Sequence, residues 1–157
     1  MPWLDPALRI ALDLMLVAVL SLIAYRDAKT SEIPDALNLA LLVLGAVALI
    51  IVPEIGFHDR LIGLVAVSGP MLLMSIMRRG SLGGGDIKLM GAAGFLLGWQ
   101  SIVLAAALGI LIAGVYAIYL VFVKKAKLDD KFPFGPMLCI GIALAYFFGS
   151  YIIVWLF

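Results

Sequence analysis

The sequence predicts an all-α, polytopic membrane protein, and its composition, hydropathy and distribution of charge each support that fold class. Of the 157 residues, 65% are hydrophobic and 13% are charged, whereas a soluble domain is about half apolar and about a quarter charged. The mean hydropathy is +1.19. A net charge of +1 gives no basis for nucleic-acid binding. Because no polar stretch is long enough for a second domain, we expect residues 1–157 to form one transmembrane domain.

Six apolar runs are candidates for membrane-spanning helices, because a span needs about 20 largely apolar residues. No small-residue cleavage pattern follows the first run, so we expect it to be a retained span rather than a signal peptide. An even number of spans places both termini on one side of the membrane. The six runs are Ala7–Tyr25, Leu37–Val52, Leu61–Met77, Ile87–Trp99, Ile102–Val123 and Gly135–Trp155.

The basic residues predict the orientation of this six-helix bundle. Nine of the 11 lysines and arginines lie in or beside the loops after the first, third and fifth runs, and only Arg9 and Arg60 lie on the opposite side. The positive-inside rule then makes those three loops cytoplasmic and both termini external. We therefore expect a multi-pass protein of the cytoplasmic (inner) membrane.

Two aspartates stand on the predicted cytoplasmic side, where apolar runs meet polar loops. Asp27 ends the first run, and Asp86 closes the segment Gly83-Gly84-Gly85-Asp86 before the fourth run. Ionisable groups at membrane depth are costly and tend to be functional, and two adjacent carboxylates can share a proton and activate water. The alternatives are an interfacial ion pair for Asp27 and a helix cap for Asp86.

The fourth run is short, and its length bears on where the glycines lie. From Ile87 to Trp99 it has 13 residues, which is about 20 Å of helix against a hydrocarbon core of about 30 Å. The glycine-rich segment is therefore expected in a recess, through a re-entrant helix or local thinning of the bilayer. Glycines there let a substrate strand approach the backbone closely.

Two proline-containing turns precede the second and sixth runs. Pro34 suits a first helical turn, where its missing N–H costs nothing, and Asp35 complements the positive end of the helix. The turn Phe132–Pro136 is expected to shape one wall of the cytoplasmic recess. Acidic residues on the same side are expected to attract a basic substrate segment; they are Glu32, Asp35, Asp129 and Asp130.

Other polar and small residues are expected to serve structure. No cluster of histidine, cysteine and carboxylate has the spacing of metal ligands, so neither a metal nor an organic cofactor is expected. Asp13 lies about 21 Å from Asp27 along a helix and is assigned no catalytic part, and Cys139 is expected to be a buried, inert thiol. Small residues at four-residue spacing suit close helix packing; they include Gly94 and Gly98, Ala105, Gly109 and Ala113, and Gly141, Ala145 and Gly149.

Three segments occur in order along the chain and together resemble the type IV prepilin peptidase family, membrane aspartyl proteases of the GxGD type. They are Asp27 with Ile33-Pro34-Asp35, the run Gly83-Gly84-Gly85-Asp86-Ile87-Lys88-Leu89, and Pro133-Phe134-Gly135-Pro136. The resemblance extends from about Leu16 to the C-terminus. It implies that Asp27 and Asp86 are the catalytic pair. It also implies roles in substrate binding or loop shape for Gly83, Gly84, Gly85, Pro34, Asp35, Lys88, Pro133, Gly135 and Pro136.

By that resemblance, the substrates are prepilin-like precursors of a type IV pilus or secretion system. The reaction implied is cleavage of a short basic leader, at the cytoplasmic face and just before the apolar helix of the precursor. Many bacterial members have an extra domain with two pairs of cysteines and also N-methylate the product. Here only about a dozen residues separate the first two runs and one cysteine is present, so we expect the short, peptidase-only form.

Three alternatives to this prediction remain open. A presenilin-like or signal-peptide-peptidase-like protease would use the same chemistry but cut within a transmembrane helix. A proton-coupled transporter or channel would use Asp27 and Asp86 as relay groups. An inactive membrane scaffold would use neither.

Overall fold

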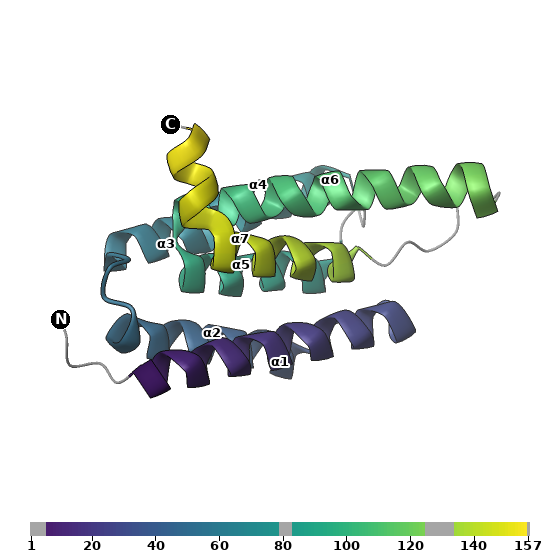
Figure 1. The fold of residues 1–157 in the computed structure, drawn as a ribbon. Coiled ribbons are helices and arrows are strands. Elements are labelled where there is room, and N and C mark those ends of the chain that lie inside the picture. Colours follow the sequence, from purple (N-terminus) through teal and green to yellow (C-terminus); the bar gives the residue numbers. More distant parts are fainter. Residues whose placement is uncertain (1–5, 79–82, 125–133, 157) are drawn as a thin grey trace.

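The computed structural model describes residues 6–78, 83–124 and 134–156, and all regular secondary structure in these ranges is helical (Figure 1). Each of the six predicted runs falls on a helical segment, which confirms the all-α prediction. The helices are α1 (Pro6–Thr30), α2 (Asp35–Ile51), α3 (Phe57–Ala66), α4 (Ser68–Met77), α5 (Gly84–Leu97), α6 (Trp99–Lys124) and α7 (Gly135–Leu156).

The third predicted run is divided into two helices, which the hydropathy pattern alone did not indicate. Helix α3 ends at Ala66 and α4 begins at Ser68. Pro70 explains the break, because in a continuous helix its ring would clash with the carbonyl of Ala66 and it has no N–H to donate. The chain resumes at once, with the N–H of Met71 donating to the carbonyl of Val67 at 3.1 Å.

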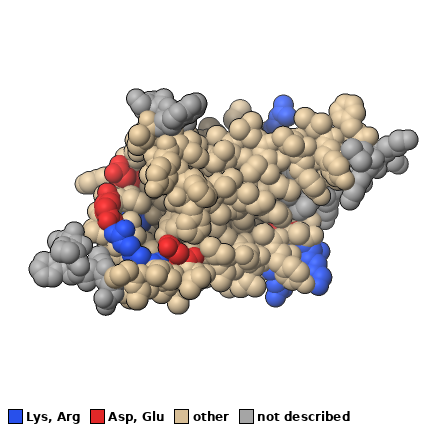
Figure 2. Space-filling model, viewed as in Figure 1, with Lys and Arg blue, Asp and Glu red and all other residues tan. Residues whose placement is uncertain are grey.

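Four segments among the described residues are long and apolar enough to cross a membrane, and the chain is accordingly a multi-pass membrane protein. These segments are Pro6–Thr30, Phe57–Met77, Trp99–Phe122 and Gly135–Val154. Helices α2 and α5 are shorter, with 17 and 14 residues. On the face shown in Figure 2, charged side chains gather toward the two ends of the molecule, and a broad uncharged surface lies between them.

Helix α5 lies at the centre of the bundle. It packs against α2, α3, α4, α6 and α7, whereas α1 packs against α2 and α7. In Figure 1, α1 and α2 lie side by side along one side of the molecule. We call the end of the bundle at Thr30, Gly84 and Gly135 the site end. The opposite end, where the helical parts nearest both termini lie, is the terminal end.

Glycines allow the close helix contacts that the small-residue pattern predicted. A Cβ on Gly94 would lie 2.0 Å from the carbonyl oxygen of Gly63, where α5 meets α3. A Cβ on Gly141 would lie 2.4 Å from the carbonyl oxygen of Ala105, where α7 meets α6. Side chains at these two positions would therefore force the helices apart.

A buried arginine joins the ends of α2 and α5. Arg60 is 0% exposed, and its guanidinium donates to the carbonyl oxygens of Ala48 at 3.0 Å and Val52 at 2.8 Å on the α2 side. It also donates to those of Phe95 at 3.3 Å and Leu96 at 2.8 Å on α5. These carbonyls carry the negative end of each helix dipole, so Arg60 stabilises both ends at once.

Candidate active site

Asp27 continues the buried stripe of α1. Leu16, Leu20, Ile23 and Asp27 follow one another at intervals of three or four residues, which places them on one face of a helix. That face meets the bundle, so Asp27 is only 6% exposed. The helix ends three residues later, where Ser31 has a positive φ of 52° that turns the chain away.

The carboxylate of Asp27 is held by the beginning of α7. The backbone N–H of Gly135 donates to Asp27 Oδ2 at 2.9 Å. A Cβ on Gly135 would lie 2.7 Å from the same oxygen, so this contact requires glycine. Pro136 follows in the first turn of α7, where its missing N–H costs no helical hydrogen bond. The contact that the structure shows for Asp27 is thus this hydrogen bond, and not the interfacial ion pair given above as an alternative.

Asp86 lies in the first turn of α5. The helix begins at Gly84. The sequence had suggested a loop for Gly84 and Gly85, but both residues are helical. Gly83 precedes the helix in extended conformation, and no side chain of the described residues, Asp86 included, forms a capping hydrogen bond at this end; the capping alternative for Asp86 is therefore wrong. Asp86 Oδ1 is buried and has no hydrogen-bond partner among the described residues.

The segment between α1 and α2 packs directly against the start of α5. A Cβ on Gly85 would lie 2.9 Å from the Cβ of Ile33, so a side chain at residue 85 would push the two segments apart. Pro34, with φ of −61°, is the N-cap residue of α2. At the surface, Lys88 Nζ of α5 pairs with Asp35 Oδ1 of α2 at 2.7 Å, although both side chains are largely exposed. These contacts fix α2 and α5 at the site end.

The structure brings Asp27 and Asp86 to one cavity at the site end. The volume of this cavity is about 360 Å³, and its lining residues are Asp27, Ser31, Glu32, Ile33, Asp35, Gly83, Gly84, Gly85 and Asp86. Asp86 precedes the apolar part of α5 and lies outside the four candidate spans. Burial and, second, the negative charge of Asp27 raise the pKa of Asp86 to about 6. The two carboxyl groups therefore interact, as a proton-sharing pair requires.

The remaining predicted site residues fall into two groups. Glu32 and Asp35, two of the acidic residues expected to attract a basic substrate segment, line the cavity. Pro133, Asp129 and Asp130 lie outside the described residues.

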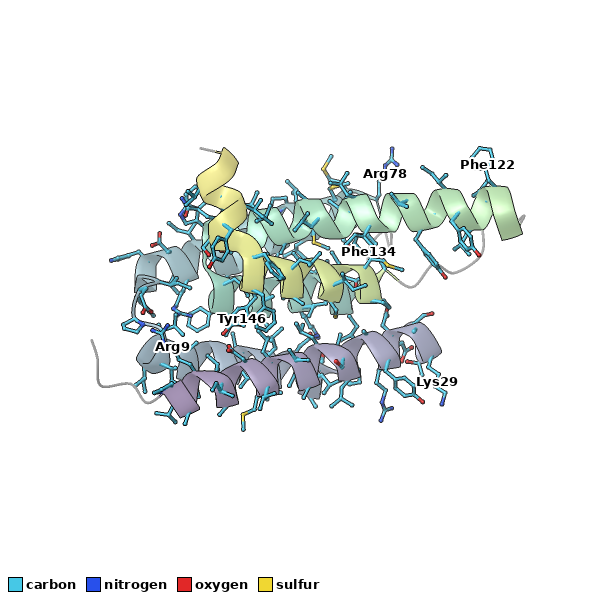
Figure 3. The ribbon with its side chains drawn as sticks, viewed as in Figure 1. Arg9, Lys29, Arg78, Phe122, Phe134 and Tyr146 are labelled. Atoms are coloured by element: carbon cyan, nitrogen blue, oxygen red, sulfur yellow. The ribbon has the colours of Figure 1, made fainter. Side chains whose placement is uncertain are left out.

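In Figure 3, Lys29 and Phe134 mark the site end, and Arg9 and Tyr146 mark the terminal end.

Asn38 was not among the residues selected from the sequence, and the structure places it beside the turn that holds Asp86. Asn38 is 5% exposed, and its Nδ2 donates to the carbonyl oxygen of Gly85 at 3.4 Å. The signal in the sequence was a single amide within the apolar run that follows Asp35. That signal could not show which helix the amide faces.

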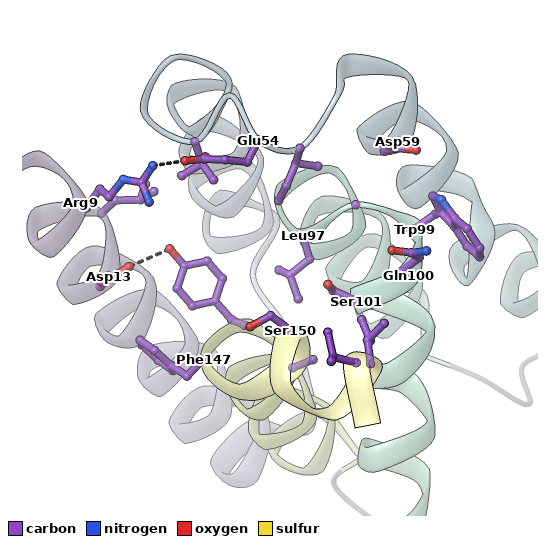
Figure 4. A pocket seen from close by; sticks show the side chains of 18 residues that line it. Arg9, Asp13, Glu54, Asp59, Leu97, Trp99, Gln100, Ser101, Phe147 and Ser150 are labelled. Carbon is purple, nitrogen blue, oxygen red and sulfur yellow. Dashed lines mark hydrogen bonds and ion pairs between the residues drawn. The ribbon is translucent and has the colours of Figure 1, made fainter. Parts of the chain in front are cut away.

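A larger cavity of about 740 Å³ lies at the terminal end, away from Asp27 and Asp86 (Figure 4). Arg9 forms an ion pair with Glu54 at its edge. The hydroxyl of Tyr146 donates to Asp13 Oδ1 at 2.7 Å. Asp13 therefore has a structural partner far from the other two aspartates.

The chain is a multi-pass helical protein with two carboxyl groups in one cavity at the site end. These features are those of a membrane aspartyl enzyme. The chain matches the type IV leader peptidase family over residues 14–118, more than half of its length. The chain belongs to this family.

Several curated relatives are similar to this chain, and each is named prepilin leader peptidase/N-methyltransferase. The protein of Bacillus subtilis is 29% identical over 137 residues, which cover 87% of this chain and 55% of that protein. The protein of Aeromonas salmonicida is 30% identical over 149 residues, covering 90% and 50%. That of Burkholderia pseudomallei is 32% identical over 145 residues, covering 86% and 45%. The chain thus spans about half the length of the curated relatives it matches.

No solved structure matches this chain significantly. The comparisons with families and curated proteins give no support to a proton-coupled transporter.

Proposed function

We propose that this chain is an aspartic endopeptidase that removes the leader from prepilin-like precursors. The observation that carries the proposal is the shared cavity of Asp27 and Asp86 at the site end. Membership of the type IV leader peptidase family supports the reaction class, and the names of the relatives support the substrate class. We propose peptide hydrolysis alone and no methyl transfer, because the carboxylate pair supports only hydrolysis.

In the proposed mechanism, the pair Asp27 and Asp86 holds one proton. The ionised member takes a proton from a water molecule, whose oxygen attacks the scissile carbonyl carbon. The protonated member donates a hydrogen bond to the carbonyl oxygen. The C–N bond then breaks, and the leaving amine takes up a proton from the pair. The Gly135 N–H keeps the Asp27 carboxylate in place throughout.

The proposed substrate has a short basic leader followed by an apolar helix. Glu32 and Asp35 line the cavity with acidic groups that attract the basic leader. Gly84 has open space where a side chain would be, which leaves room for an extended peptide beside Asp86. We place the site end on the cytoplasmic side of the inner membrane, since the basic loops precede α2, α5 and α7.

Mass spectrometry of a prepilin-like precursor incubated with the purified protein in detergent tests this proposal. We expect cleavage by the wild-type protein, with or without a metal chelator, and no cleavage by Asp27→Asn or Asp86→Asn. Asp13→Asn is the matched control, because Asp13 lies in the same helix but toward the terminal end, and it should cleave normally. An Asp86→Asn protein that processes the precursor at the wild-type rate would refute the assignment.

A further inference from the structure

Asn38 is a buried polar residue on an otherwise apolar face of α2. The buried residues of this helix include Asn38, Leu41, Gly45 and Ala48, and their spacing places them on the face that meets α5. Asn38 Oδ1 is buried and has no hydrogen-bond partner among the described residues. A buried, unpaired polar atom is costly, so packing alone does not account for an amide here.

The contact that Asn38 does make is to the peptide unit that precedes Asp86. Its Nδ2 donates to the carbonyl oxygen of Gly85. The carbonyl of Gly85 and the Cα of Asp86 belong to one planar peptide unit, so holding this oxygen restricts the direction in which Asp86 leaves the backbone. Ile33 packs against Gly85 as well.

The two aspartates differ in how their carboxyl groups are held. Asp27 Oδ2 accepts a hydrogen bond from the N–H of Gly135. Asp86 Oδ1 has no partner among the described residues. Because no partner holds Oδ1, the direction of the Asp86 side chain depends more on its backbone, and Asn38 donates a hydrogen bond to that backbone.

We propose that Asn38 is a positioning residue, which holds the Gly85–Asp86 peptide unit so that the Asp86 carboxyl faces Asp27 across the cavity. Asn38 is not among the residues that line the cavity, so it acts through Asp86 rather than on the substrate. This inference rests on the proposed function, in which Asp86 is one of the two reacting groups.

Two substitutions of similar size test the proposal in the precursor cleavage assay. Asn38→Leu keeps the volume but removes the amide, and Asn38→Asp keeps the shape but removes the N–H donors. We expect each to lower kcat by about tenfold to a hundredfold, the scale of a misplaced reacting group. KM should stay close to that of the wild type, because Asn38 does not line the cavity.

Leu41→Ala is the matched control, because Leu41 is a buried, apolar residue on the same face of α2. It should lower thermal stability while the folded protein keeps its kcat. An Asn38→Leu protein with wild-type kcat overturns the proposal. If Asn38→Leu yields no folded protein, Asn38→Asp decides by the same criterion.

A second measurement needs no substrate. The chain has one cysteine, Cys139, so Cys139→Ala gives a background for the reporter Gly84→Cys, at a position where an added Cβ meets nothing within 4 Å. We expect Asn38→Leu to change the rate at which a maleimide labels this reporter, and Leu41→Ala to leave it unchanged. An unchanged rate with Asn38→Leu overturns the positioning role. Absence of cleavage by the wild-type protein would overturn the proposed function instead, and labelling would still test Asn38.

Discussion

At the scale of single residues, the two aspartates sit in unlike surroundings. Asp27 accepts a hydrogen bond from a backbone N–H at the start of α7, whereas Asp86 lies in the first turn of α5, where burial and, second, the charge of Asp27 raise its pKa. One carboxyl group is thus held by a hydrogen bond, and burial disfavours the ionised form of the other.

Gly135→Ala should remove activity while leaving the helices in place. The added methyl would lie 2.7 Å from Asp27 Oδ2, so either the carboxylate or the start of α7 must move, at a typical cost of about 1–3 kcal/mol. We expect kcat for precursor cleavage to fall by about a hundredfold. Gly114→Ala in α6 is the control, because a side chain there meets nothing within 4 Å. Full activity of Gly135→Ala would show that the contact with Asp27 is dispensable.

Asp86→Asn should be more stable than the wild type at neutral and higher pH. Because the pKa of Asp86 is raised from 3.8 to about 6 in the folded protein, folding favours the protonated form. Wild-type stability is therefore greatest below the unfolded pKa and falls as the pH rises through the folded value. Asp86→Asn has no carboxyl group to ionise at this position, so its stability should not fall in this way as the pH rises.

Thermal unfolding in detergent at about pH 4 and about pH 8 measures the effect. The difference between Asp86→Asn and the wild type should appear at the higher pH and vanish at the lower. Asp35→Asn is the control, because its exposed pair with Lys88 contributes little stability. A variant no more stable than the wild type at the higher pH contradicts the argument.

The sequence predicted the two aspartates but not the groups that hold them. A carboxylate beside an apolar run stands out because its burial is costly, so Asp27 and Asp86 could be selected from the sequence alone. The family resemblance named Gly135 only for substrate binding or loop shape. Its hydrogen bond to Asp27 could not be predicted, because a backbone donor has no sequence signature and its target lies 108 positions away. Likewise, the sequence could not show that Asn38 reaches Gly85 across the bundle.

At the scale of elements, the ends of α2 and α5 are joined twice. Asp35 and Lys88 pair at the site end, and Arg60 binds backbone carbonyls of both helices at the terminal end. The charge pattern assigned Arg60 only to a side of the membrane. Its burial was not predictable, because an arginine near the end of an apolar run is most often exposed at the interface. The division of the third run followed from Pro70, a local signal that hydropathy does not weigh.

Arg60→Met should destabilise the protein strongly. The substitution removes the guanidinium donor from carbonyl oxygens at the ends of α2 and α5. Ala48 O keeps the N–H of Val52, but each buried oxygen left with no donor costs about 1–3 kcal/mol. We expect a marked fall in the midpoint of thermal unfolding and loss of most folded protein. Arg9→Met tests the contribution of charge alone, because Arg9 pairs with Glu54 at the surface; its effect should stay below about 1 kcal/mol. Equal stability of the two variants would count against the role of Arg60.

At the scale of the whole molecule, the candidate active site lies at one end of the bundle, and the start of α1 and the end of α7 lie at the other. The even number of predicted runs implied that both ends of the chain lie on one side of the membrane. The division of the third run does not change this number, because α3 and α4 together form one candidate span. The orientation in the membrane can be tested with single cysteines in a Cys139→Ala background.

An impermeant maleimide added to intact cells should label His58→Cys and leave Lys29→Cys unlabelled. His58 lies at the start of α3 at the terminal end, and Lys29 lies at the site end. Both native side chains are exposed, so access to the reagent depends on the side of the membrane. Permeabilised cells provide the control, in which both should react. Labelling of Lys29→Cys alone in intact cells would reverse the proposed orientation.

The shortness of α5 has a consequence for how the protein should respond to the thickness of its membrane. Its 14 residues make about 21 Å of helix, less than the hydrocarbon thickness of an ordinary membrane, and such mismatch carries an energy for every ångström. Vesicles made from phospholipids with shorter acyl chains would lower that energy and keep Asp86 in contact with water. Turnover should therefore rise as the acyl chains shorten, so that membrane thickness itself tunes the rate.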